Sequence, residues 1–339
     1  MNRAEAIRKA RLQKRKSFSV KIRRFLAAFF IMFTILCLLT AGFLFYGPDT
    51  RLKELFVTTA MNTMSHQYLA RILVSDAEIA SIMEKYKIND PIEDTNQDEI
   101  SLPAKGAEGD DSIDGIEKID IKGSTYKGYL LIVKDPSRVS LATTPQLGVR
   151  GTKVEDIVKS NNAVAGINAG GFADLDGHGT GGIPEGIIIE DGRILYSDNA
   201  SSHYIIGFNE KNILVLGKYS KARIESLKIR DAVSFRPFLI VNGKPTITQG
   251  DGGWGIAPRT AIGQRTDGAV LLLAIDGRQL SSVGATLKDV QDIMVEYGAH
   301  NAANLDGGSS TTLVYDDRLI NSPSSQYGPR YVPSAFIVK

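Results

Sequence analysis

The feature that most constrains this chain is an apolar run at residues 25–46, which carries no charged side chain in 22 positions. At 1.5 Å per residue, a helix of that length reaches about 33 Å, enough to cross a hydrocarbon core of about 30 Å. The run is longer than the apolar region of a cleaved signal peptide, and Gly47-Pro48-Asp49 follows it instead of a small-x-small cleavage site. We therefore predict an uncleaved transmembrane anchor at residues 25–46.

The charge distribution predicts how that anchor is oriented. Residues 1–24 contain ten Lys or Arg and a single acid, Glu5, the bias that keeps an N-terminus in the cytoplasm. We expect a single-pass protein of the cell membrane, with a basic cytoplasmic tail at 1–24 and residues 47–339 outside. The rest of the chain has 30 basic and 37 acidic residues, so it gives no electrostatic reason to expect nucleic-acid binding.

Three segments are expected beyond the anchor. Residues 47–88 contain two helix-like stretches, the second with a Ser75–Glu78 capping box, and are interpreted as a short helical stalk. Residues 89–115 are acidic and poor in large apolar side chains, which favours a flexible linker. Residues 116–339 form the predicted folded domain. The only cysteine, Cys37, lies in the anchor, so this domain has no disulfide, no thiol nucleophile and no cysteine metal site.

Short β-rich runs separated by glycine dominate the folded domain. Several are continuously apolar, which is typical of strands covered on both faces. Asp191-Gly192 and Asn242-Gly243 indicate hairpin turns, and residues 286–297 predict a helix that begins at Thr286 and stops at Gly298. The fold class is α+β, a strand-rich mixed-sheet domain with few helices. The predicted strands lie at 129–133, 163–168, 186–190, 204–208, 213–217, 238–243, 269–276, 301–306, 311–316 and 334–339.

Polar residues flanked by glycine gather in four clusters at the ends of apolar runs, where ligands approach the backbone closely. Alone, each cluster has an ordinary reading as a tight turn. In the last cluster, Asp306 precedes two glycines and three hydroxyls, an arrangement suited to an anion or a sugar. The clusters are Asn168-Ala-Gly-Gly-Phe172, Arg259-Thr-Ala-Ile-Gly263, Asp276-Gly-Arg278 and Asn304-Leu-Asp-Gly-Gly-Ser-Ser-Thr311.

Together with Pro329-Arg330-x-Val332, the order and spacing of these clusters resemble the phosphodiester glycosidase family over about residues 160–339. The family includes the lysosomal uncovering enzyme, which removes N-acetylglucosamine from a sugar-1-phosphate diester. Two departures are Ala169 inside the first motif and one glycine fewer before the serines. The anchor and stalk look like those of bacterial relatives associated with exopolysaccharide biosynthesis. The sequence does not match the Cys-rich region of the animal enzyme, so the resemblance does not extend to its mannose-linked substrate.

The resemblance implies a hydrolase that cleaves sugar-1-phosphodiester linkages in cell-envelope or exopolysaccharide glycans, with no cofactor. It implies a glycan or sugar-phosphate substrate and a place beside exopolysaccharide assembly machinery. The phosphate charge suits arginine, and oxocarbenium-like charge at C1 suits a carboxylate. Asp306 is the first choice of catalytic carboxylate and Asp276 the second, with Arg259 on the phosphate. The expected substrate-binding residues are Asn168, Gly170, Gly171, Trp254, Arg278, Asn304, Gly307, Gly308, Ser309, Ser310, Thr311 and Arg330.

Several alternatives stay open. For Glu185, a solvated loop acid is preferred over a functional carboxylate. For the sequence around Asp174 and His178, a glycine-rich surface loop is preferred over a calcium site. The single tryptophan, Trp254, either stacks on a sugar ring or anchors the core. The chain is either an enzyme or a non-catalytic polysaccharide-binding protein that organises export. For an enzyme, cleavage of the P–O bond instead of the C–O bond is a further alternative.

Overall fold

The computed structural model describes residues 3–63, 66–88, 93–102, 115–174, 179–325 and 328–339. The chain divides into two units, Met1–Glu54 and Leu55–Lys339. The first unit consists mainly of helix α1, Arg3–Tyr46, whose Val20–Phe43 segment is long and apolar enough to cross a membrane. A membrane span or a signal sequence fits that segment, and the chosen anchor at 25–46 largely coincides with it.

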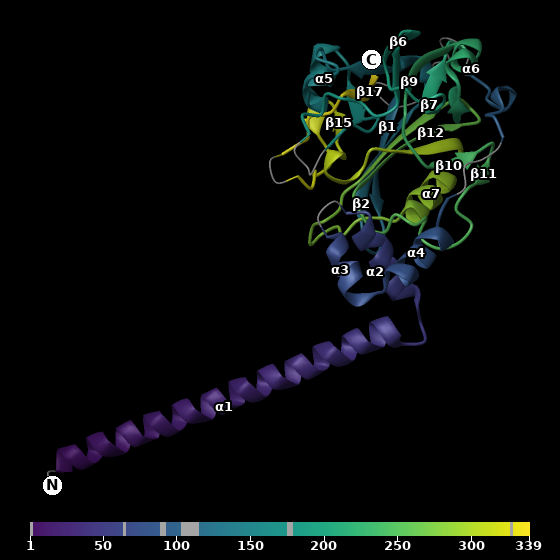
Figure 1. The fold of residues 1–339 in the computed structure, drawn as a ribbon. Coiled ribbons are helices and arrows are strands. Elements are labelled where there is room, and N and C mark those ends of the chain that lie inside the picture. Colours follow the sequence, from purple (N-terminus) through teal and green to yellow (C-terminus); the bar gives the residue numbers. More distant parts are fainter. Residues whose placement is uncertain (1–2, 64–65, 89–92, 103–114, 175–178, 326–327) are drawn as a thin grey trace. The chain divides into compact units, whose positions relative to one another are not determined.

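Few helices and many strands make up the described residues, drawn in Figure 1 as coiled ribbons and arrows. The helices are α2 Arg51–Met61, α3 Gln67–Leu73, α4 Asp76–Lys85, α5 Val154–Ser160, α6 Lys221–Ser226 and α7 Leu287–Glu296. The strands are β1 Ile116–Lys122, β2 Lys127–Val133, β3 Val139–Thr143, β4 Ala165–Asn168, β5 Ile187–Glu190, β6 Arg193–Ser197, β7 His203–Asn209, β8 Leu214–Tyr219, β9 Ile229–Val233, β10 Phe238–Val241, β11 Lys244–Pro245, β12 Arg259–Arg265, β13 Val270–Ile275, β14 Ala299–Leu305, β15 Leu313–Tyr315, β16 Arg318–Leu319 and β17 Ser334–Val338.

The strands form three antiparallel sheets. The largest has the order β1-β2-β13-β12-β14-β10-β11, and the other two are β16-β15-β4-β17-β3 and β6-β5-β9-β7-β8. One apolar cluster joins the inner faces of all three sheets, with Leu272, Phe336 and Phe208 among its members. Because each sheet contributes to this shared core, residues from distant parts of the chain are held in fixed positions relative to one another.

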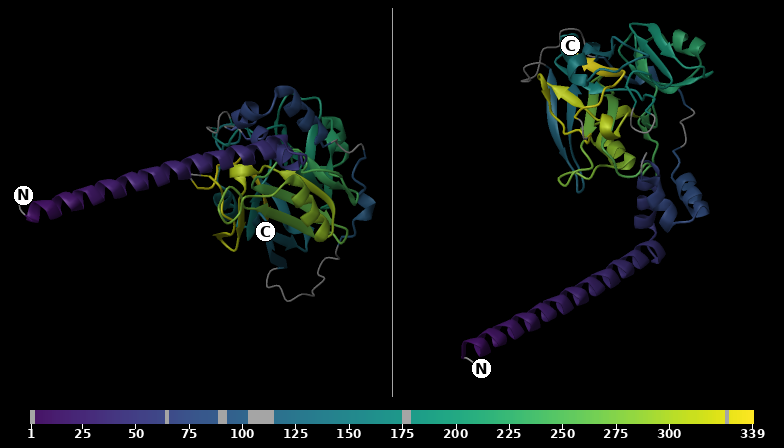
Figure 2. Two further views of the ribbon diagram at one scale, coloured as in Figure 1. Left: turned by 90° about the horizontal axis from the view of Figure 1, so that it is seen from below. Right: turned by 60° about the vertical axis from the view of Figure 1, so that its left-hand side comes forward.

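The outer faces of the sheets are covered separately. Helix α7 buries Leu287, Val290 and Met294 on the large sheet, while α5 and α6 cover one smaller sheet each. Covering on both faces explains why the apolar runs are continuous instead of alternating. Figure 2 shows the sheets from two further directions. The predicted α+β, strand-rich fold is confirmed.

Local signals in the sequence account for the connections that the structure shows. Asp191-Gly192 and Asn242-Gly243 adopt positive φ values of 50° and 74°, and 50° and 70°, as a two-residue hairpin turn requires. Thr286 caps α7 and forms a capping box with Asp289. Both hairpin predictions and the helix prediction are confirmed.

The segment before the sheets differs in detail from the prediction. Helices α2, α3 and α4 lie in this segment, and from Leu55 onward the chain belongs to the same compact unit as the sheets. Residues 93–102 also hydrogen-bond to this unit: the Thr95 hydroxyl donates to the Leu216 carbonyl at 2.9 Å, and Ser101 N–H to the Thr266 carbonyl at 2.7 Å. Residues 93–102 therefore differ from the flexible linker that their composition favours, because hydrogen bonds and the buried side chain of Ile100 hold them against the sheets. Residues 89–92 and 103–114 lie outside the described residues, and the remaining domain boundaries stay a prediction.

Candidate active site

Three neighbouring strands of the largest sheet meet at one edge of the site. Strand β12 is antiparallel to β13 and β14, with Arg259 paired to Ile275 and Thr260 paired to Leu305. Arg259 opens β12, whereas the other three clusters lie at the ends of β4, β13 and β14. Antiparallel pairing nevertheless brings the start of β12 to the ends of β13 and β14, so Arg259 lies beside the two Asp-Gly turns.

Asn168, at the end of β4, fastens the second sheet to this edge. Its side-chain nitrogen donates to the Asp306 carbonyl at 2.6 Å, and Asp306 N–H donates to the Ala169 carbonyl at 3.0 Å. The side-chain oxygen of Asn168 accepts from Thr260 Oγ1 at 3.1 Å and from Thr312 N–H at 2.9 Å. Since Asn168 is fully buried, it holds Asp306 in place from beneath and does not face a ligand.

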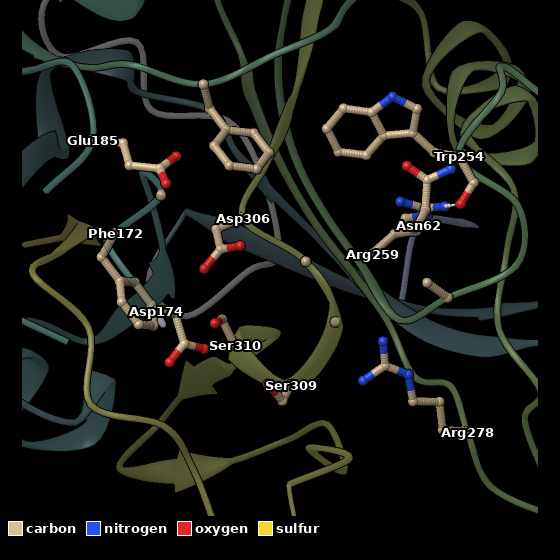
Figure 3. Close-up of a pocket in the computed structure, with 15 residues that line it drawn as sticks. Asn62, Phe172, Asp174, Glu185, Trp254, Arg259, Arg278, Asp306, Ser309 and Ser310 are labelled. Carbon is tan, nitrogen blue, oxygen red and sulfur yellow. Dashed lines mark hydrogen bonds between the residues drawn. The ribbon is translucent and has the colours of Figure 1, made fainter. Parts of the chain in front are cut away.

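Above this edge lies a cavity of about 340 Å³. Figure 3 shows Asp306, Ser310, Asp174 and Glu185 gathered on one side of it, with Arg278 and Arg259 on the other. Nine of its lining residues are ones that the sequence indicated: Gly171, Trp254, Arg259, Arg278, Asp306, Gly307, Gly308, Ser309 and Ser310.

Among these lining residues, Asp306 has the largest shift in pKa. Burial raises its pKa to about 7; the Ser310 hydroxyl hydrogen bond opposes that rise, and the negative charge of Glu185 adds to it. A carboxyl that titrates near neutral pH can exchange protons under working conditions, which is what a general acid or base requires. The geometry therefore makes Asp306 the leading candidate for acid–base chemistry.

The two arginines that line the cavity differ in their exposure to solvent and in their hydrogen bonds to the protein. Arg259 is buried, donating from Nε to the Ala285 carbonyl and from Nη2 to the Trp254 and Gly255 carbonyls at 2.9 and 2.6 Å. Burial lowers its pKa to about 10. Arg278 is exposed, and a Cβ added at Gly308 would lie 3.5 Å from its Nη2, so the guanidinium passes close to the glycine turn. Arg278 is thus better placed than Arg259 to contact an anion.

The remaining residues indicated by the sequence do not line the cavity. Asp276 is tied to Asn321 and Ser322, Asn304 donates to the Arg236 carbonyl, and Thr311 accepts from Thr260. Gly170 packs close to Val233. Arg330 stands just behind the wall: it pairs with Asp174 at 2.8 Å, donates to Ser309 Oγ at 3.3 Å and lies 5.4 Å from the Phe172 ring centre.

Six lining residues were not chosen from the sequence as site residues: Asn62, Phe172, Asp174, Glu185, Phe235 and Ala257. Glu185 is an exposed loop residue, as read, yet it lines the cavity, and partial burial raises its pKa against the opposing effect of Arg236. Phe172 stood within the first motif and was available as a signal. Asn62 had none, because its place depends on packing between segments far apart in the chain.

Trp254 is a core residue that also reaches the cavity, so stacking on a sugar ring stays a prediction. It packs against the apolar core beneath α7 and also lines the cavity, where it meets Phe235 edge to face at a ring-centre distance of 6.3 Å. Among the described residues, no group of three or more His, Cys, Asp and Glu side chains is arranged to hold a metal. Asp176 and His178, part of the weak calcium-like pattern, lie outside those residues.

Comparison with known proteins gives the class. The sequence profile of the phosphodiester glycosidase family matches residues 161–339, slightly more than half of the chain. The chain belongs to the phosphodiester glycosidase family, a family of hydrolases that act on phosphodiester-linked sugars. The matched region contains every candidate site residue named from the sequence.

Individual relatives are more distant. The SPbeta prophage-derived uncharacterized protein YomE of Bacillus subtilis (strain 168) is 30% identical over 182 residues, which is 50% of this chain and 27% of YomE. The N-acetylglucosamine-1-phosphodiester alpha-N-acetylglucosaminidase of Mus musculus is 26% identical over 225 residues, 60% of this chain and 42% of the mouse protein. The chain thus spans less than half the length of these two relatives.

A solved structure shares the fold. The catalytic domain of the zebrafish N-acetylglucosamine-1-phosphodiester alpha-N-acetylglucosaminidase, described as auto-inhibited by its pro-peptide, superposes with a TM-score of 0.58. The match covers 70% of this chain and 86% of the zebrafish chain at 24% identity. At that identity the likeness establishes the fold alone.

Proposed function

We propose that this protein is a membrane-anchored hydrolase that cleaves sugar-1-phosphodiester linkages of the N-acetylglucosamine-1-phosphate type in cell-envelope or exopolysaccharide glycans. The observation that carries the proposal is the arrangement of one cavity, with Asp306 on one side and Arg278 on the other. In a sugar-1-phosphodiester, a carbon that becomes cationic lies next to an anionic phosphate. A carboxylate can stabilise the first and an arginine can bind the second.

On the phosphate side, Arg278 supplies a planar set of donors that matches two phosphate oxygens. Gly308 has φ +60°, and the absence of a side chain there leaves the turn open to the guanidinium. The backbone itself is a weaker anion site than the glycine pattern indicated. Gly308 N–H already donates to the Pro258 carbonyl, and Ser310 N–H to the Gly307 carbonyl.

On the sugar side, Asp306 acts on C1. The leaving group is a phosphate monoester, which is stable as an anion, so protonating it matters less than in an ordinary glycoside. We therefore assign Asp306 the role of activating water or attacking C1 directly, with stabilisation of the oxocarbenium-like charge. Glu185 and Asp174 add negative charge around the same carbon, and the Arg330 pair holds Asp174 in position.

The location follows from the N-terminal segment. Residues 1–24 carry the positive charge that stays on the cytoplasmic side, and residues 25–46 supply the span. The domain from 47 onward then faces outside, where envelope and exopolysaccharide glycans and their assembly machinery are found. Protease added to intact protoplasts should digest the domain, whereas full protection contradicts this orientation.

The decisive test uses the purified full-length protein in detergent, with an N-acetylglucosamine-1-phosphodiester as substrate in ¹⁸O-labelled water. Cleavage of the C–O bond places the label on the sugar and leaves a phosphate monoester, while P–O cleavage places the label on phosphate. We expect label on the sugar, and loss of turnover in Asp306→Asn. Binding without turnover supports instead a polysaccharide-binding protein that organises export.

A further inference from the structure

The helical segment before the sheets is in direct contact with a glycine-rich loop at the cavity. This loop, residues 250–255, carries Trp254. Thr58 Oγ1 donates to Asp251 Oδ2 at 2.7 Å, Ile256 N–H donates to Thr59 Oγ1 at 3.1 Å, and Asn62 Nδ2 donates to the Gly253 carbonyl at 2.8 Å. Thr58 is fully buried, so helix α2 is packed against the loop and does not merely lie near it.

The glycines of the loop are fitted to this segment. Gly255 has φ +58°, and a Cβ there would lie 2.2 Å from Thr59 Cα. Gly253 has φ +74°, and a Cβ there would lie 2.6 Å from the Tyr86 carbonyl oxygen. No other residue type tolerates both the backbone conformation and the close approach, so the loop conformation depends on the helices that cover it.

The loop in turn positions the cavity. The carbonyls of Trp254 and Gly255 accept hydrogen bonds from Arg259, which opens β12 at the floor of the site. A continuous set of contacts therefore runs from α2 through the loop to both Trp254 and Arg259. The loop lies within the family match at residues 161–339, whereas helix α2, where this set of contacts begins, lies outside it.

Asn62 itself reaches the cavity. Its Nδ2 donates to the Thr58 and Gly253 carbonyls, both at 2.8 Å, and two carbonyl partners fix which end of the amide is the nitrogen. The Oδ1 atom is then an oriented acceptor at the wall, next to Trp254 (Figure 3). A sugar ring stacked on an aromatic side chain presents hydroxyl or acetamido N–H donors at its edge, which an acceptor in this position can meet.

We propose that Asn62 is a sugar-binding residue and that Thr59 is a positioning residue, so that α2 forms part of the sugar subsite together with Trp254. The inference rests on the proposed function for its substrate class, a sugar-1-phosphodiester. It assigns specificity to a segment close to the predicted anchor, outside the matched family region.

The first measurement is steady-state kinetics of the full-length protein in detergent with an N-acetylglucosamine-1-phosphodiester. Asn62→Ala should raise KM about tenfold and change kcat less than threefold, because an uncharged hydrogen bond to substrate is lost and the chemistry is untouched. Ser81→Ala, an exposed change in α4 of the same segment, is the matched control and should match wild type. Unchanged KM in Asn62→Ala overturns the sugar contact.

The second measurement uses the intrinsic fluorescence of Trp254, the only tryptophan in the chain. Thr59→Val keeps the side-chain shape but removes the acceptor for Ile256 N–H, so it should shift the emission and weaken N-acetylglucosamine 1-phosphate binding several-fold. A loss of stability without an altered emission or Kd indicates a purely structural role and overturns the positioning assignment.

The outcomes separate this inference from the proposed function. Turnover by wild type with an unaltered KM in Asn62→Ala refutes the inference alone. Binding without turnover refutes hydrolysis, and the Kd of Asn62→Ala, measured by Trp254 emission, then decides the sugar contact. If wild type neither binds N-acetylglucosamine 1-phosphate nor turns over the diester, both proposals fail.

Discussion

The two Asp-Gly turns of the site make an instructive pair. Asp276-Gly277 follows β13 and Asp306-Gly307 follows β14, at the same edge of the same sheet. The Asp306 carboxyl faces the cavity, and burial raises its pKa to about 7. Asp276 Oδ1 instead accepts from Asn321 Nδ2 at 3.2 Å and Ser322 N–H at 2.7 Å, and only 8% of the residue is exposed.

The difference lies in what each carboxylate meets. Asp276 is engaged by the strand-linking segment at 321–322, so it closes a turn and holds a loop. Asp306 has its main-chain groups fixed by Ala169 and Asn168, which leaves the side chain to face the cavity. The same dipeptide at the same strand position thus serves structure in one case and, we propose, chemistry in the other. What separates them is non-local packing.

Asp306→Asn is the strongest test of the difference between the two turns. The substitution preserves shape and removes the charge, so we expect kcat to fall by on the order of a hundredfold or more. Turnover of an N-acetylglucosamine-1-phosphodiester measures it, with Asp316→Asn, at an exposed turn, as the control. Wild-type turnover in Asp306→Asn means that Asp306 only terminates its strand.

A second, smaller effect should come from the residue that follows the structural turn. Arg278→Ala removes the guanidinium beside Gly308, and we expect kcat/KM to fall on the order of tenfold to a hundredfold, mostly through KM. Arg278 has φ +58°, a conformation that an arginine rarely adopts, which places the side chain at the cavity at a conformational cost of about 1 kcal/mol. Arg318→Ala, exposed on a hairpin, is the control; equal losses in both variants refute a specific phosphate contact.

Much of the fold was predictable because its signals are local. Apolar runs indicated the strands, Thr286 with Asp289 indicated α7, and the glycine motifs led to Asp306. Other features depend on contacts between distant residues. The composition of 93–102 gave no hint of its hydrogen bonds, and Asn62 meets Gly253 across 191 positions. Asp276 and Asp306 were both candidates because nothing in either motif reveals which carboxylate its neighbours will engage.

The pH dependence of stability gives a third test, which does not depend on turnover. The pKa of Asp306 is raised in the folded state from its usual 3.8 to about 7, so its ionisation destabilises the fold. This penalty is absent below pH 3.8, grows between 3.8 and 7, and is complete above 7. At pH 8, Asp306→Asn should therefore increase the free energy of unfolding by at most about 4 kcal/mol, at about 1.4 kcal/mol per pKa unit, and thermal unfolding should show a higher Tm. The gain should shrink as pH falls towards 4; a constant difference across this range refutes the shifted pKa.

The smallest effect on activity is expected at Asp276. Asp276→Asn keeps the oxygen that accepts from Asn321 and Ser322, so we expect kcat/KM to change less than threefold. Asp276→Ala removes the acceptor of Asn321 and Ser322, although Asn321 Nδ2 keeps its hydrogen bond to the Thr311 carbonyl, so stability should fall by about 1 kcal/mol in urea unfolding. Folded Asp276→Ala should retain most of its turnover, since the residue holds the 321–322 segment and does not line the cavity. A hundredfold loss of kcat in Asp276→Asn, with stability unchanged, reverses the two assignments and makes Asp276 the catalytic carboxylate.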